Sequence, residues 1–118
     1  MQISEPFKCF RVAAVLVCMS AAAHAAELLV VESDDCPYCK RFQAEIAVAY
    51  PKTAEGKVAP LRLLELGQPM PDEYQSISPA TVAPTFILVH ENTEVDRIVG
   101  YPGDEFFWFR LGQMLDKL

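Results

Sequence analysis

The chain has 118 residues, a formal net charge of −6 and a hydrophobic fraction of 52%. Such a length fits one small domain. The acidic balance, with no basic stripe along the chain, argues against nucleic-acid binding because it repels phosphate backbones.

The first 25 residues have the pattern of a secretory signal peptide. Lys8 and Arg11 form a positive flank, and residues 12–23 form an uncharged run shorter than the about 20 apolar residues of a membrane span. The run ends at Ala23-His24-Ala25, with small residues at the two positions that signal peptidase recognises. We therefore predict cleavage after Ala25, export to the periplasm and no stable membrane insertion after processing. An uncleaved anchor is the alternative.

Removal of the signal leaves residues 26–118 as one domain with eight basic and fifteen acidic residues. Its net charge is therefore −7. Cys9 and Cys18 are lost with the signal, so two cysteines remain, Cys36 and Cys39. A structural disulfide stabilises most when it closes a long loop, whereas a C-x-x-C pair closes almost none. The spacing therefore favours redox chemistry.

The first half of this domain predicts a strand–helix–strand unit. Residues 28–31 are a short apolar run, typical of a strand buried on both faces, and residues 33–35 (Ser-Asp-Asp) offer side chains to cap a following helix. Apolar positions then recur at helical spacing: Cys39, Phe42, Ile46 and Ala49. Pro51 ends this helix, and residues 61–66 form a second apolar strand. This order predicts a parallel pair of strands.

The second half predicts a hairpin. Residues 67–84 are rich in turn-forming residues, with one helical turn around residues 72–77. Residues 85–89 form a third strand, residues 91–94 a turn, and residues 95–99 alternate like a half-buried edge strand.

A last helix is expected after a turn at residues 100–103, with Asp104 as its cap. Its apolar residues share one face: Phe107, Leu111, Met114, Leu115 and Leu118. The neighbouring aromatic residues 106–109 cannot all face one core, so part of this aromatic surface should be exposed. The whole order, β-α-β then β-β-α, belongs to the α/β class.

The sequence Cys36-Pro37-Tyr38-Cys39 lies where the first strand passes into the first helix. Unpaired N–H groups and the positive end of the helix dipole favour a thiolate at Cys36, which is the predicted nucleophile. Cys39, one turn later and more buried, is the predicted resolving residue. A zinc half-site is the alternative, but zinc takes four ligands and the domain adds one histidine, His90. We expect no metal, and no cofactor beyond the Cys36–Cys39 pair.

Two segments resemble known families. The Cys36–Cys39 motif resembles that of dithiol glutaredoxins, and residues 82–86 resemble the cis-proline segment of the thioredoxin superfamily. The resemblance implies a minimal thioredoxin-like fold, with a mixed four-stranded sheet flanked by helices. It also implies that the Ala83–Pro84 bond is cis and that Pro84 packs beside the two cysteines. The implied substrate-binding residues are Pro37, Tyr38, Ala83 and Thr85.

Residues 97–108 and 50–56 narrow the resemblance to the small periplasmic thioredoxin-like proteins of bacterial sulfur-oxidation gene clusters, the SoxS type. This likeness implies a thiol–disulfide oxidoreductase that reduces partner proteins bearing a reactive cysteine or a disulfide. It also implies an upstream thiol electron donor.

Charges around the motif favour the reductase direction. Glu32, Asp34 and Asp35 oppose a thiolate, and Tyr38 is uncharged where strong oxidases carry histidine. Two other functions stay open: a non-catalytic module that binds a partner of the same pathway, and a disulfide oxidase or isomerase.

Thioredoxins carry a buried acid six residues before the first cysteine, and here that residue is Val30. The base for Cys39 is therefore unassigned; Glu32 is a candidate, with a merely solvated carboxylate as the alternative.

Overall fold

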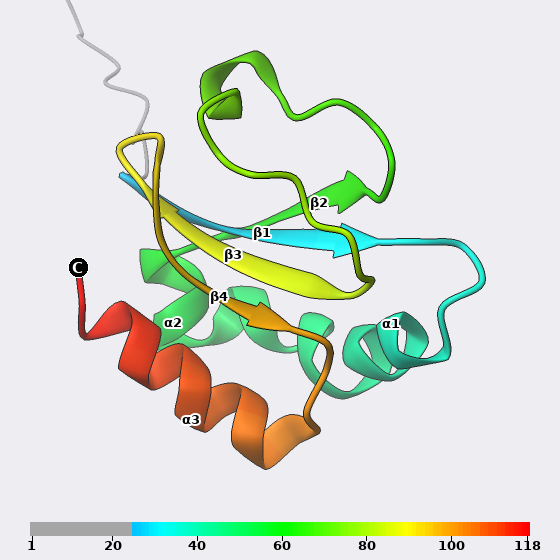
Figure 1. Cartoon of the computed structure of the whole chain (residues 1–118). Coiled ribbons are helices and arrows are strands. Elements are labelled where there is room, and N and C mark those ends of the chain that lie inside the picture. The colour runs from blue at the N-terminus through cyan, green and yellow to red at the C-terminus, as the bar shows by residue number, and fades with distance from the viewer. Residues whose placement is uncertain (1–24) are drawn as a thin grey trace, which may run out of the picture.

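A mixed four-stranded sheet forms the centre of the structure, a computed structural model that describes residues 25–118 (Figure 1). The strands are β1 (Ala26–Glu32), β2 (Leu61–Glu65), β3 (Thr85–His90) and β4 (Thr93–Val99), in the order β2-β1-β3-β4. β1 and β2 are parallel, and β3 is antiparallel to both β1 and β4. The predicted α/β class and element order are confirmed. The predicted signal peptide, apart from Ala25, lies outside the described residues.

Helical segments cover one face of the sheet (Figure 1). They are α1 (Pro37–Phe42), the π-helical η1 (Gln43–Ala47), the 3₁₀ turn η2 (Tyr50–Lys52), α2 (Ala54–Val58) and α3 (Asp104–Leu115). The helix expected to run up to Pro51 is therefore divided, and Pro51 lies inside η2. Within residues 25–118, no helix is long and apolar enough to cross a membrane.

An aromatic cluster fills the core between the sheet and these helices. Phe42 of α1 lies with its ring centroid 4.8 Å from that of Phe86 in β3 and 5.5 Å from that of Phe107 in α3. All three side chains are fully buried. Burial of large aromatic side chains is the main favourable term in a core of this size. This cluster therefore fixes α1 and α3 against the sheet.

The opposite face of the sheet is covered by a loop, residues 66–84, rather than by a long helix (Figure 1). Its one helical turn is η3 (Asp72–Tyr74), within the turn expected at residues 72–77. Tyr74 and Ile77 are buried against Leu29, Val31, Ile87 and Val89. Both faces of β1 are therefore buried, as the apolar run at residues 28–31 predicted, and both faces of β3 are buried as well.

Several local expectations were wrong. Asp104 does not cap α3: the cap is Gly103, whose φ of 95° suits glycine, and Asp104 is the first helical residue. The Ser-Asp-Asp segment does not cap α1 either, because Cys36 takes that position. The hairpin turn is shorter than expected, with Glu91 and Asn92 at positive φ and Thr93 already in β4. Leu118 is 43% exposed instead of sharing the buried face of α3.

Gly56 in α2 lies close against the backbone of Tyr50 in η2. The buried Tyr50 donates a hydrogen bond from its hydroxyl to the Ala59 carbonyl at 2.7 Å. A Cβ added at Gly56 would lie 1.9 Å from the Tyr50 carbonyl oxygen, whereas one added at Gly112 in α3 would meet nothing within 4 Å.

We expect Gly56→Ala to lower the free energy of unfolding by about 2 kcal/mol or more, because overpacking against a rigid backbone costs about 1–3 kcal/mol. The matched control, Gly112→Ala, should raise that free energy by up to about 1 kcal/mol, since alanine is the better helix former. Urea unfolding of the oxidised proteins measures both. If Gly56→Ala unfolded at the same urea concentration as the wild-type protein, the close contact between Gly56 and the Tyr50 carbonyl would be contradicted.

Candidate active site

The two cysteines stand at the start of α1 and form a disulfide, with their Cα atoms 5.1 Å apart. Cys36 is the N-cap, with extended backbone dihedrals, and its Sγ accepts the backbone N–H of Cys39 at 3.1 Å. Pro37 follows at the first helical position, where a missing N–H costs no helical hydrogen bond. The sulfur of Cys36 thus receives one of the N–H groups that every helix start leaves unpaired.

The cysteines are almost equally buried, with 6% of Cys36 and 4% of Cys39 exposed. Cys39 is the more buried of the two, as predicted, but only slightly. Burial alone therefore does not distinguish the two sulfurs. The distinction lies in the hydrogen bond and in the helix position of Cys36.

The Ala83–Pro84 peptide bond is cis, which confirms the prediction from the family resemblance. Thr85, the next residue, pairs with Val31 near the end of β1. Pro84 therefore lies at the end of the sheet where the chain leaves β1 and continues to Cys36 (Figure 1). The structure therefore brings the motif at residues 36–39 and the proline segment at residues 82–86 to the same end of the sheet.

The residues predicted to contact a substrate differ in exposure. Tyr38 is 56% exposed and Pro37 is also exposed, whereas Ala83 is half-buried. Thr85 is buried, and its hydroxyl donates to the carbonyl of Val82 at 2.5 Å. Among these four residues, exposed contact area therefore comes from Pro37 and Tyr38.

Acidic side chains precede the motif in the chain. Asp34 and Asp35 are exposed in the turn before Cys36. Glu32, the last residue of β1, is half-buried, and its Oε1 accepts a hydrogen bond from the side chain of Gln43. This contact joins the end of β1 to the first residue of η1, directly after α1, and the sequence analysis did not predict it.

A second contact missed by the sequence analysis ties the helix to the segment after β4. The Tyr101 hydroxyl donates to Oε2 of Glu45, and the Arg41 guanidinium lies 5.5 Å from the centre of the Tyr101 ring. Arg41 also donates to Oε1 of Glu45 at 3.2 Å. The hydrogen bond from Tyr101, and then the one from Arg41, lower the pKa of the Glu45 carboxyl. Arg41 is therefore engaged with Glu45 rather than free to support a thiolate.

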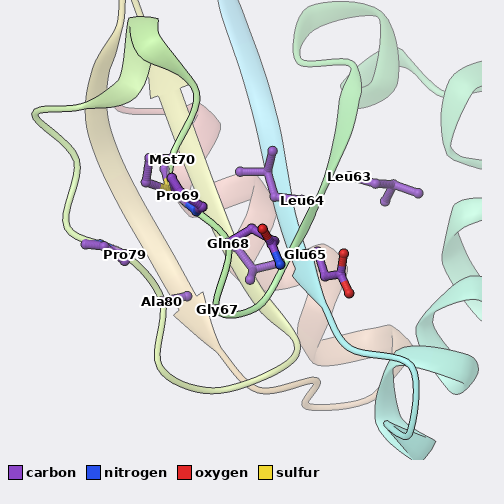
Figure 2. Close-up of a pocket in the computed structure, with 10 residues that line it drawn as sticks. Leu63, Leu64, Glu65, Gly67, Gln68, Pro69, Met70, Pro79 and Ala80 are labelled. Atoms are coloured by element: carbon purple, nitrogen blue, oxygen red, sulfur yellow. The ribbon is translucent and has the colours of Figure 1, made fainter.

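Two of the hollows in the surface differ in their relation to the cysteines. One, of about 560 Å³, is lined by Cys39 together with Glu32, Lys40 and Gln43 among others. The other, of about 520 Å³, lies between the end of β2 and the following loop, and Figure 2 shows Leu64, Met70 and Ala80 on its walls. The second hollow lies on the loop-covered face and contains neither cysteine. Among residues 25–118, no group of three or more His, Cys, Asp or Glu side chains could hold a metal ion.

Comparison with known proteins gives a consistent result. A family model described as a thioredoxin-like domain matches residues 19–114. The periplasmic thioredoxin SoxS of Paracoccus pantotrophus is 39% identical, over 78% of this chain and 97% of its own, with a TM-score of 0.74. A Fasciola hepatica thioredoxin is 19% identical, over 77% and 82% of the two chains, with a TM-score of 0.55, and shows the shared fold alone. No curated protein gives a significant match.

The geometry predicts unequal reactivity of the two thiols in the reduced protein. Cys36 should be alkylated at neutral pH at least about tenfold faster than Cys39, because a helix-terminal hydrogen bond lowers the pKa of a thiol. Peptide mapping after a brief pulse of iodoacetamide measures the two rates. Replacing Cys36 by serine should leave a slowly reacting protein, and replacing Cys39 a fast one. Equal labelling of both thiols would overturn the assignment.

Proposed function

The chain belongs to the thioredoxin-like domain family, and from this premise we propose that it reduces disulfides in partner proteins through Cys36 and Cys39. The observation that carries the proposal is the position of Cys36. Its sulfur caps the redox helix, accepts a backbone N–H and is paired with Cys39. A thiolate at such a position is stabilised and can attack.

The reaction then proceeds by two exchanges. The Cys36 thiolate attacks one sulfur of the partner disulfide, and the other partner sulfur leaves as a thiolate. Cys39 next attacks Cys36 in the mixed disulfide, which releases the second partner thiol and forms the Cys36–Cys39 disulfide. Two electrons pass to the partner, and the sulfur pair itself carries them without a further cofactor. An upstream thiol donor must then reduce the pair for another cycle.

The setting we propose is the periplasm, with the predicted signal peptide directing export. The likeness to the periplasmic thioredoxin SoxS supports this location. By the same likeness, we propose that the substrate is a cysteine-bearing protein of a sulfur-oxidation pathway. The exposed Pro37 and Tyr38 and the segment around Ala83 would contact that partner.

A serine at the resolving position tests the exchange reaction. Cys39→Ser, once reduced, should form a covalent complex with oxidised insulin that disappears when reductant is added, because attack occurs without release. Wild-type protein should instead speed insulin reduction by dithiothreitol. The Cys36→Ser/Cys39→Ser double variant is the matched control and should do neither. If wild type does not speed reduction while the double variant still binds a partner, the protein is a non-catalytic module.

The direction of electron flow follows from the charge around the pair. The carboxylates of Glu32, Asp34 and Asp35 disfavour a thiolate, and Tyr38 adds no positive charge. The helix dipole opposes this effect by about 0.3–1 kcal/mol. Because about 30 mV corresponds to 1.4 kcal/mol in a two-electron couple, the dipole raises the potential by only roughly 20 mV. It therefore does not make the couple a strong oxidant.

We accordingly expect a reduction potential well below the about −120 mV of strong disulfide oxidases. Equilibration with graded glutathione buffers, with the oxidised fraction read by thiol labelling, measures the potential. The double variant Asp34→Asn/Asp35→Asn should raise it slightly at low salt, and added salt should remove the difference because both side chains are exposed. A value near that of the strong oxidases would identify the protein as an oxidase instead.

A further inference from the structure

We infer that Glu32 accepts the proton of the Cys39 thiol during the second exchange, and that Gln43 positions the Glu32 carboxylate for this task. The inference rests on the exchange reaction proposed above. Its chemical basis is general: the thiolate is the nucleophile, and an unperturbed thiol with a pKa of about 8.5 is mostly protonated at neutral pH. Cys39 must therefore lose a proton before it attacks.

Glu32 lies on the correct side of the sheet. It is two residues beyond Val30 in β1, and alternate residues of a strand share a face. Val30 packs in the core beneath the helices, so Glu32 points to the helical side, at the end of the strand. Glu32 and Cys39 line the same hollow of about 560 Å³. A polar hollow of this volume is large enough to hold water, which can carry a proton from one side chain to the other.

Gln43 links the carboxylate to the cysteine. Its backbone N–H bonds to the carbonyl of Cys39, and its side-chain Nε2 donates to Oε1 of Glu32. Within the described part of the chain, Oε2 of Glu32 has no hydrogen-bond partner and is available to take a proton. The carboxylate is thus held by a residue that is itself bonded to the main chain of Cys39.

The other charged groups near the hollow are less suited to this role. Asp34 and Lys40 line it but are exposed, and Glu65 of β2 borders the neighbouring hollow that Glu32 and Asp34 also line. Among residues 25–118, neither Asp34 nor Glu65 has a side-chain hydrogen bond that would hold it near the sulfur. Lys40 is a cation, which favours a thiolate but accepts no proton.

The step balances as follows. The Cys39 proton passes to Glu32, directly or through one water, and the Cys39 thiolate attacks the Cys36 sulfur. The Cys36–Cys39 bond forms, the bond from Cys36 to the partner breaks, and the partner sulfur leaves with the electron pair. The proton on Glu32 then returns to solvent or to the departing thiolate.

A base role and a purely electrostatic role for Glu32 predict opposite changes in the rate of the second exchange when the carboxylate is removed. A negative charge beside a thiol raises the pKa of the thiol, so removing that charge should make the thiolate easier to form. If Glu32 acted through its charge alone, Glu32→Gln would speed the second exchange. If Glu32 accepts the proton, the same substitution slows it.

The test uses a dithiobis-nitrobenzoate reagent, which releases one coloured thiolate when Cys36 attacks and a second when Cys39 resolves the mixed disulfide. We expect Glu32→Gln to leave the first release at least as fast as in wild type, because it removes a negative charge near the motif. The second release should slow about a hundredfold near neutral pH, the low end of general-base effects. In Glu32→Gln, the rate of the second release should depend on pH only through ionisation of the Cys39 thiol. The fall in rate at acidic pH that protonation of a general base causes (the acidic limb of the profile) should be lost. Gln43→Ala should slow the second release by a smaller factor, about threefold, with the acidic limb kept.

Asp34→Asn is the matched control, since it removes a carboxylate from the same hollow without a proposed proton transfer. It should not slow the second release. A second release in Glu32→Gln as fast as in wild type, or faster, would overturn the assignment of Glu32 and leave the exchange reaction intact. Failure of wild type to give a second release would overturn both proposals.

Discussion

The position of the redox pair depends on the packing of Phe42. This residue follows Cys39 by three positions, so it lies on the same side of the helix and one turn further along. Its ring meets Phe86, Phe107 and Tyr101, with the Tyr101 centroid 6.0 Å away. One side chain therefore joins the redox helix to β3, to α3 and to the turn between β4 and α3. The short α1 would have little stability alone, because isolated helices of this length are not stable in water.

The elements that the sequence predicted well are those whose signal is a burial pattern. The apolar run at residues 28–31 became a strand buried on both faces because helices cover one side and the loop with Tyr74 and Ile77 covers the other. The Cys36–Cys39 spacing likewise predicted the helix start. The cis bond before Pro84 came from family resemblance and not from physical reasoning, since most X-Pro bonds are trans.

The features that were missed are contacts between side chains far apart in the sequence. Nothing local marks Gln43 as the partner of Glu32, or Tyr101 as the donor to Glu45, because each pair meets only after α1 and η1 pack against the sheet. The capping errors have a different cause. A side chain suited to capping was assigned to each helix start, but at α1 the sulfur of Cys36 took that place, and at α3 the backbone needed a positive φ that glycine adopts.

In the proposed reductase, the acidic surroundings of the motif would meet two requirements that at first look opposed. A reductase needs a disulfide that is favoured over the thiolate form, and carboxylates near the sulfurs supply this by raising the free energy of the thiolates. The same charges would slow resolution, which needs a Cys39 thiolate, if they acted only through space. A carboxylate that also receives the proton removes the conflict, because it speeds formation of the thiolate without stabilising it at equilibrium. A half-buried Glu32, held by Gln43 at the hollow that Cys39 also lines, would satisfy both conditions, whereas an exposed Asp34 would satisfy only the first.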